Sequence, residues 1–320
     1  MAWLRGLIHS QVNFSECDEH EAENYKEFKC YDNALTAYKT IERITLLKNN
    51  QTEEMMEKFG VPSDPRFINN SVDFLNVFSD TLSYGNQYKT LNIYLQVMCE
   101  QFNNINMSND DQVISLVSSI TDFMFGKDKF FDNNIENLKN TSIKSTSKST
   151  RSWTYMTCNE LGWFQSASGL LKSELIDLDS HLHKCNELFN ISKLPDTDKF
   201  NKKYGGYNPN VTKVVYTNSH FDPWSKLTMK QNNTKNSIIS LTIKDGFHID
   251  DLYEPTDEDS ESLIIVRNET INQLLDWMNE GEKQQLPYWI WIAIACSIVF
   301  IIVVIVVVVI ICKNSDKENL

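Results

Sequence analysis

Apolar positions recur every three to four residues in several stretches of the first half of the chain. Ala34, Tyr38, Ile41 and Ile44 follow this spacing, which predicts an amphipathic helix that ends near residues 48–50. Three further stretches show a similar pattern and are predicted to be helices: residues 74–82, 91–102 and 113–125. Residues 139–150 are instead rich in Ser, Thr and Lys and predict a flexible polar loop.

Two short apolar runs in the second half of the chain are typical of buried strands. Residues 211–215 lead to Asp222 in an Asp-Pro turn, and residues 237–243 lead to His248 in the next loop. In α/β-hydrolases an acid and then a histidine follow strands in this order, as the last two members of a Ser…Asp…His triad. The His takes a proton from the nucleophile, and the Asp holds its tautomer.

Residues 287–312 form an uncharged run of about 25 mostly apolar residues, and a membrane-spanning helix needs roughly 20. Tyr288, Trp289 and Trp291 stand where an interfacial aromatic belt would lie. A buried core helix would be shorter and amphipathic. The run therefore predicts a transmembrane helix that contacts the lipid bilayer, with residues 313–320 as a short cytosolic tail.

Charge and cysteines narrow the class of protein. The 320 residues suffice for one large domain or two, and the net charge of −13 argues against nucleic-acid binding, which needs a basic face. The chain has no Cys-x-x-Cys and no His at metal-ligand spacing, so we expect neither a metal nor a cofactor. Cys296 and Cys312 lie in the apolar run. The other five cysteines favour disulfides in an oxidising compartment, with the pairing left open: Cys17, Cys30, Cys99, Cys158 and Cys185.

Asn-x-Ser/Thr glycosylation acceptors occur only before the apolar run, which favours a lumenal or extracellular body. They begin at Asn13, Asn50, Asn69, Asn106, Asn140, Asn190, Asn210, Asn232 and Asn268. Residues 1–11 do not resemble a signal peptide, because Arg5 interrupts their apolar run. We therefore expect an export signal in a segment that precedes Met1.

Several motifs together resemble one family. Residues 216–225, with Asp222-Pro-Trp-Ser, are similar to its "NG..DPWS" segment, and residues 246–252 to its "GAHHLDL" segment. Residues 151–160 are similar to its "W.YQ.C.E" motif. The family is that of the serine exopeptidases lysosomal Pro-X carboxypeptidase, dipeptidyl peptidase II and thymus-specific serine protease. The resemblance covers essentially residues 1–280.

The resemblance implies an α/β fold: a partial α/β-hydrolase domain with an inserted helical cap. Residues 1–23 would be a remnant of the hydrolase domain, residues 24–190 the cap, and residues 191–280 the hydrolase part that carries Asp222 and His248. It also implies that Trp224 lines the pocket for the residue before the scissile bond. Trp153, Tyr155 and Glu160 would face the cleft from the cap motif, with ordinary packing as the alternative.

The nucleophile of such an enzyme is not found in the sequence, which contains no Gly-x-Ser-x-Gly. Residues 1–5, Met-Ala-Trp-Leu-Arg, resemble the family's helix directly after the "GGSYGG" elbow. We therefore expect the chain to be a fragment that begins after the catalytic Ser and is inactive alone. A gene that has lost its front end is the alternative.

These observations predict the C-terminal part of a membrane-anchored serine exopeptidase acting on peptides, of the Pro-X carboxypeptidase or dipeptidyl peptidase type. The body would lie in a lysosome-like lumen or at the cell surface. Two alternatives stay open: a non-catalytic membrane-anchored peptide-binding protein, and a tail-anchored cytosolic product with unused glycosylation sites. The oligomeric state is also open, with a homodimer as one option.

Overall fold

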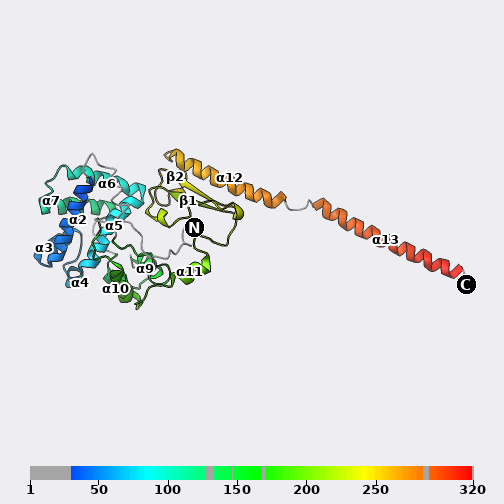
Figure 1. The fold of residues 1–320 in the computed structure, drawn as a ribbon, viewed down its shortest axis with the longest axis horizontal. Coiled ribbons are helices and arrows are strands. Elements are labelled where there is room, and N and C mark those ends of the chain that lie inside the picture. Colours follow the sequence, from blue (N-terminus) through cyan, green and yellow to red (C-terminus); the bar gives the residue numbers. More distant parts are fainter. Residues whose placement is uncertain (1–29, 127–132, 146, 168–170, 284–287, 319–320) are drawn as a thin grey trace. The chain divides into compact units, whose positions relative to one another are not determined.

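The computed structural model describes residues 30–126, 133–145, 147–167, 171–283 and 288–318. The chain divides into two compact units, Met1–Val266 and Arg267–Leu320. The described part of the first unit consists mainly of helices, followed by a small parallel sheet (Figure 1). Its α-helices are α2 (Cys30–Leu47), α3 (Asn50–Lys58), α4 (Pro65–Ile68), α5 (Ser71–Gln87), α6 (Lys89–Phe102), α7 (Asp110–Phe125), α8 (Ile135–Leu138), α9 (Lys148–Met156), α10 (Leu178–Phe189) and α11 (Thr197–Tyr204).

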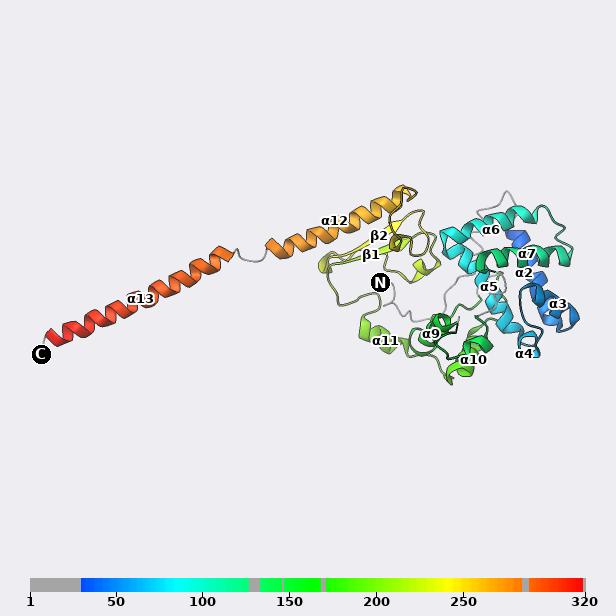
Figure 2. The ribbon, with the colours of Figure 1, turned by 180° about the vertical axis from the view of Figure 1, so that it is seen from behind.

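The main hydrophobic core lies among α2, α3, α5, α6 and α7, which cluster together in both views (Figures 1 and 2). The four helices predicted from apolar spacing are confirmed as α2, α5, α6 and α7. α7 begins three residues before the predicted start at residue 113, because the Asn109 side chain caps it by accepting a hydrogen bond from the Gln112 amide at 3.1 Å.

Aromatic rings fill the centre of this core. Tyr38 stacks on Phe78 at 5.4 Å between ring centroids, and Phe59 meets Phe74 edge to face at 5.8 Å. The Tyr38 hydroxyl is buried, but it lies 2.9 Å from Ser79 Oγ and accepts a hydrogen bond from the Ser173 amide at 2.8 Å. A buried hydroxyl satisfied in this way ties the segment after residue 170 to the helical core.

Two disulfides confirm the expectation drawn from the scattered cysteines. Cys30–Cys99 joins α2 to α6, and Cys158–Cys185 joins the π-helical turn η4 (Thr157–Leu161) to α10. Cys17 lies outside the described residues.

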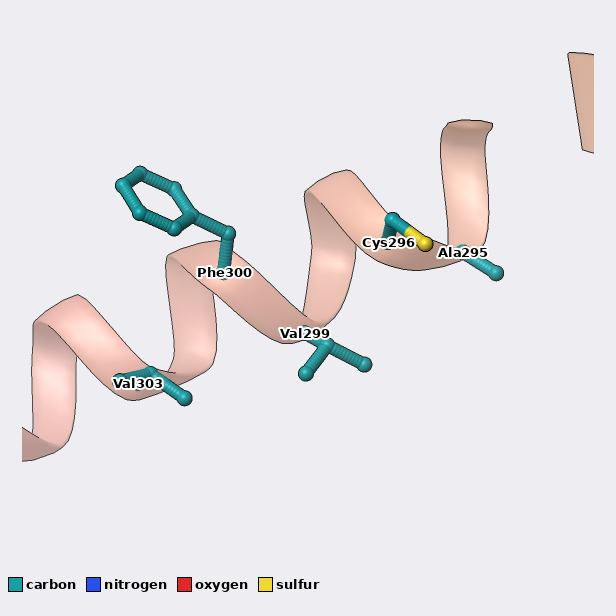
Figure 3. Close-up of a pocket in the computed structure, with 5 residues that line it drawn as sticks. All are labelled: Ala295, Cys296, Val299, Phe300 and Val303. Carbon is teal, nitrogen blue, oxygen red and sulfur yellow. The ribbon is translucent and has the colours of Figure 1, made fainter. Parts of the chain in front are cut away.

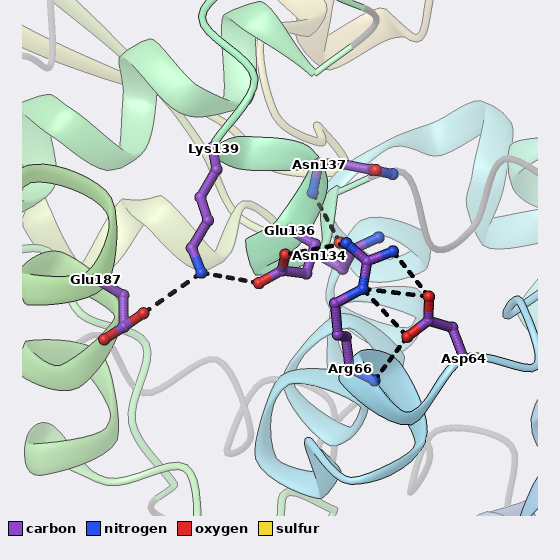
Figure 4. Close-up of polar contacts among 7 residues, drawn as sticks. All are labelled: Asp64, Arg66, Asn134, Glu136, Asn137, Lys139 and Glu187. Atoms are coloured by element: carbon purple, nitrogen blue, oxygen red, sulfur yellow. Dashed lines mark hydrogen bonds and ion pairs between the residues drawn. The ribbon is translucent and has the colours of Figure 1, made fainter.

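A chain of ion pairs connects three other helical segments on the surface (Figure 4). Arg66 pairs with Asp64 at 2.7 Å and with Glu136 at 3.8 Å, and Lys139 bridges Glu136 at 2.8 Å and Glu187 at 3.4 Å. These pairs link α4, α8 and α10. Exposed pairs of this kind contribute at most about 1 kcal/mol each, so they orient the helices more than they hold them.

The sheet consists of β1 (Val214–Ser219) and β2 (Ile238–Ile243), which are parallel with Val214 opposite Ile238. β1 begins later than predicted and runs through Ser219, because Lys213 has a φ of 56° and breaks the extended backbone before it. The predicted polar loop 139–150 also differs, since α9 already begins at Lys148. The first turn of α12 (Glu261–Lys283) packs Leu263 and Val266 against Ile243 of β2.

The last helix, α13 (Tyr288–Glu318), is almost uniformly apolar. Its segment Tyr288–Val306 has a mean hydropathy of 3.0 and no buried residues, so it is long and apolar enough to cross a membrane. A shallow hollow on its surface is lined by five of its own residues: Ala295, Cys296, Val299, Phe300 and Val303 (Figure 3). Among the described residues this helix alone lines the hollow, so the hollow is a gap between neighbouring side chains and not an enclosed ligand cavity.

Candidate active site

Asp222 lies three residues beyond the carboxyl end of β1. It caps the short 3-10 helix η5 (Pro223–Leu227): its Oδ1 accepts a hydrogen bond from the Trp224 amide at 2.8 Å. Pro223 at the first helical position fixes the backbone there, and it needs no hydrogen-bond partner. Because Oδ1 accepts this capping hydrogen bond, the carboxylate is oriented and Oδ2 is left available to another donor.

His248 lies in the loop after β2, and this loop is bound to the one after β1. The His220 amide donates to the Ile243 carbonyl and the Phe221 amide to the Gly246 carbonyl, both at 3.0 Å. The loops approach so closely that a Cβ on Gly246 would lie 2.6 Å from Ile243 Cγ2 and 2.9 Å from Ser219 Oγ. The glycine is therefore required by space, and it brings the histidine loop against the aspartate loop.

The two predicted triad residues are in contact. Asp222 Oδ2 lies 2.9 Å from His248 Nδ1, with the Asp side chain 12% and the His side chain 25% exposed. When Nδ1 donates its proton to the carboxylate, Nε2 carries a lone pair that can accept a proton. This is the arrangement a general base requires, and the partial exposure of the ring leaves room for a reacting group.

The other acids near His248 in the sequence have different hydrogen-bond partners. Asp245 accepts from the hydroxyls of Ser260 and Ser262, and Asp250 accepts from the Phe247 amide at 2.8 Å. Asp251 accepts from the Thr217 hydroxyl. These carboxylates hold the loop, and Asp222 is the acid that faces the imidazole.

Trp224 packs in a cluster of indole rings beside this pair. Its ring centroid lies 5.7 Å from that of Trp153, 5.6 Å from that of Trp163 and 6.4 Å from the His248 ring. The structure therefore brings Trp224 and Trp153 together beside the Asp222–His248 pair, and their roles in substrate binding stay predictions. Trp163 was not predicted, because it follows η4 with no periodic pattern to place it.

Tyr155 and Glu160 are not brought to the pair in the part of the chain that the structure describes. Tyr155 is 46% exposed and packs edge to face on Phe189, with 5.2 Å between ring centroids. Glu160 is exposed on η4. Their roles as substrate contacts stay predictions.

Two residues at the end of α5 also meet the histidine, and the sequence carried no signal for either. The Gln87 carbonyl accepts a hydrogen bond from the His248 amide at 2.8 Å. The Tyr88 ring meets the imidazole edge to face at 5.7 Å. Burial raises the pKa of Tyr88, so its phenol is a neutral hydrogen-bonding group rather than a base.

The predicted glycosylation sites are accessible wherever the structure describes them. The asparagines from Asn50 to Asn268 in that set are all exposed, whereas Asn13 lies outside the described residues. Exposure is needed for modification but does not show it, so glycosylation stays a prediction.

The acid and the histidine in the loops after two adjacent parallel strands are the arrangement of an α/β-hydrolase-like fold. Residues 6–270 match the serine carboxypeptidase S28 family, and the chain belongs to this family. It is 31% identical to the thymus-specific serine protease of Mus musculus over 156 residues, which are 47% of this chain and 30% of that protein. It is 20% identical to the lysosomal Pro-X carboxypeptidase of Homo sapiens over 190 residues, 58% of this chain and 37% of that protein.

A third relative is a probable extracellular serine carboxypeptidase of Arthroderma benhamiae, 32% identical over 112 residues, 32% of this chain and 16% of that protein. The matched regions thus span between 16% and 37% of the length of these curated relatives.

Proposed function

We propose that this chain carries the general base of a membrane-anchored serine exopeptidase. The observation that carries the proposal is the 2.9 Å contact of Asp222 Oδ2 with His248 Nδ1, in loops that follow two adjacent parallel strands. Residues 191–280 would be the hydrolase part and residues 24–190 its helical cap, with residues 1–23 as a hydrolase remnant.

In this proposal His248 Nε2 takes the proton from a serine hydroxyl as the hydroxyl oxygen attacks the peptide carbonyl. The imidazolium then gives that proton to the leaving amine, and the Asp222 carboxylate stabilises the positive charge between the two steps. Since the sequence holds no Gly-x-Ser-x-Gly, the nucleophile would come from another part of the hydrolase domain.

The substrate would be a peptide cleaved after proline or a small residue. The indole faces of Trp224 and Trp153 support this choice, because flat aromatic faces pack well against a pyrrolidine ring. The names of the relatives, among them a Pro-X carboxypeptidase, agree with it. Whether dipeptides or single residues are released stays open.

The test uses a protein in which this chain is joined to a family segment that carries Gly-x-Ser-x-Gly. Hydrolysis of a proline-containing fluorogenic peptide should vanish in His248→Ala and persist in His183→Ala, a control that alters an exposed histidine of α10. Equal activity in the two variants would remove His248 from the reaction.

A second candidate is a non-catalytic peptide-binding protein on the same anchor. The three packed indoles favour it, because an aromatic cluster can bind an apolar peptide side chain without a nucleophile. Binding of a proline-containing peptide by the chain alone, without turnover, would support this candidate.

We also propose that α13 spans a membrane, with the body of the chain in a lumenal or extracellular space. Its exposed apolar surface, the two disulfides and the exposed Asn-x-Ser/Thr asparagines support this topology.

A further inference from the structure

Gln87 is the last residue of α5 and contacts two residues of the candidate active site. Its carbonyl accepts from the His248 amide at 2.8 Å, and its side-chain Oε1 accepts from Trp224 Nε1 at 3.1 Å. We propose that the Gln87 side chain is a positioning residue that fixes the Trp224 indole and thereby the affinity for a substrate side chain. The proposal rests on the function proposed above.

The contact to His248 depends on the position of Gln87 at a helix end. The last carbonyls of an α-helix have no partner inside the helix, so they are available to other amides. The next residue, Tyr88, is extended with φ −119° and ψ 127°, and it turns the chain away from the helix axis. Because this contact uses only backbone atoms, any residue at position 87 can make it.

The contact to Trp224 depends on the glutamine side chain itself. An indole has one hydrogen-bond donor, and its partner selects one of the ring's rotamers. Trp224 is half-buried, packs against Trp153 and Trp163, and also lies near His248. A fixed rotamer therefore fixes which edge and face of the indole are presented beside the imidazole.

Because the backbone of Gln87 contacts His248 and its side chain contacts Trp224, a positioning role of the side chain can be distinguished from a purely structural role. A substitution that removes the side-chain amide leaves the backbone carbonyl contact to the histidine loop in place. It frees the Trp224 ring and also removes the hydrogen bond between the Gln87 side chain and the Tyr88 phenol. A substitution that merely loosened α5 would disturb the His248 backbone amide and the Trp224 indole together. The two roles therefore predict different patterns of change at these two groups.

The experiment uses the full chain in detergent micelles, labelled with ¹⁵N at tryptophan and histidine. Gln87→Met removes the acceptor at similar volume, and Gln87→Glu keeps an acceptor oxygen. Gln51→Met makes the same exchange at an exposed position of α3 and serves as the control. The Trp224 indole resonance is assigned by its loss in Trp224→Phe, and the tripeptide Ala-Pro-Ala is the binding probe.

We expect Gln87→Met to move the Trp224 indole resonance, leave the His248 backbone amide resonance unchanged and weaken peptide binding about two- to tenfold. Gln87→Glu should restore the affinity to within about twofold of the original chain. An unchanged Trp224 resonance and affinity in Gln87→Met would overturn the proposal, as would a shift of the His248 backbone amide resonance together with that of the Trp224 indole.

The proposed function can fail separately from this inference. If the original chain binds no Ala-Pro-Ala but Gln87→Met still moves the Trp224 resonance and Gln87→Glu restores it, the positioning contact is supported. The same result counts against a peptide site at this place.

Discussion

At the scale of single residues, the contact between Asp222 and His248 determines what this part of the fold can do. The Trp224 amide orients the Asp222 carboxylate, and the Gln87 carbonyl holds the histidine loop by accepting from the His248 backbone amide. A general base on an anchored loop, with its partner carboxylate already oriented, loses little conformational freedom when it reacts, which favours proton transfer.

The first prediction concerns the charge of Asp222. In a protein completed with the nucleophile segment, Asp222→Asn should lower kcat by about 10⁴, because the imidazolium loses its counter-charge and Nδ1 its acceptor. Steady-state kinetics on a proline-containing peptide measure this. Asp245→Asn and Asp250→Asn should each lower kcat by less than about tenfold, since these acids face hydroxyl and amide groups instead. A comparable loss in either control would mean that the acid of the triad has been misassigned.

The second prediction concerns the space at Gly246. Gly246→Ala should destabilise the fold by about 1–3 kcal/mol, because the added methyl would meet Ile243 and Ser219 well inside normal contact distance. The midpoint of urea unfolding, followed by tryptophan fluorescence, reports the loss. An unchanged midpoint would show that the two loops can separate at no cost.

At the scale of elements, apolar spacing predicts the long helices because each packs one stripe on a shared core. Ala34, Tyr38, Ile41 and Ile44 are all buried on α2, as their spacing indicates. Strand ends were less predictable, because the left-handed conformation of Lys213 leaves no trace in a pattern of apolar residues. The same limit applies to the site. Asp222 and His248 could be predicted because they follow strands in a known order, whereas Gln87 lies on a helix, 137 positions before its partner Trp224, and no sequence pattern links the two.

The third prediction concerns α10, where the His181 ring stacks on Phe164 with 5.3 Å between centroids. Burial, aided by the nearby Lys172 charge, lowers the pKa of His181 to about 4. The folded state thus holds a neutral ring while the unfolded chain binds a proton below its ordinary pKa of about 6.5. The stabilisation that this residue contributes is fully present above a pH of about 6.5. It decreases by about 3 kcal/mol in all as the pH falls towards 4.

Urea unfolding at pH 7 and at pH 4 tests this sign. The difference in unfolding free energy between the original chain and His181→Gln should shift in favour of the variant at the lower pH. His183→Gln, which changes an exposed histidine of the same helix, should show no such shift. The comparison is made between variants because the buried Asp73 and Asp80, whose pKa values are raised by burial, oppose the trend in every variant.

At the scale of the whole molecule, the fourth prediction joins the glycosylation sites to α13. Expressed behind a signal sequence, the chain should lose apparent mass on glycosidase treatment and stay with membranes in carbonate, because its Asn-x-Ser/Thr sites all precede an apolar helix. Replacing Phe300 and Val303 with Arg should release it, since each charge at a helix centre costs about 3 kcal/mol on insertion. Carbonate-extractable, unshifted protein would contradict both the span and the topology.

The two disulfides offer a way to tell in which compartment a copy of the chain folded, because such bonds persist in oxidising compartments and are rare in the cytosol. They close loops between positions 69 and 27 residues apart, and loops of such lengths are worth about 3.5–4.5 kcal/mol each in a chain-entropy account. A copy released into a reducing cytosol would lack both cross-links and much of the stability of a typical domain. The ratio of disulfide-bonded to free cysteines in protein taken directly from cells therefore reports the compartment in which the copies folded. It separates exported copies from any that stayed behind, even when the two have the same sequence.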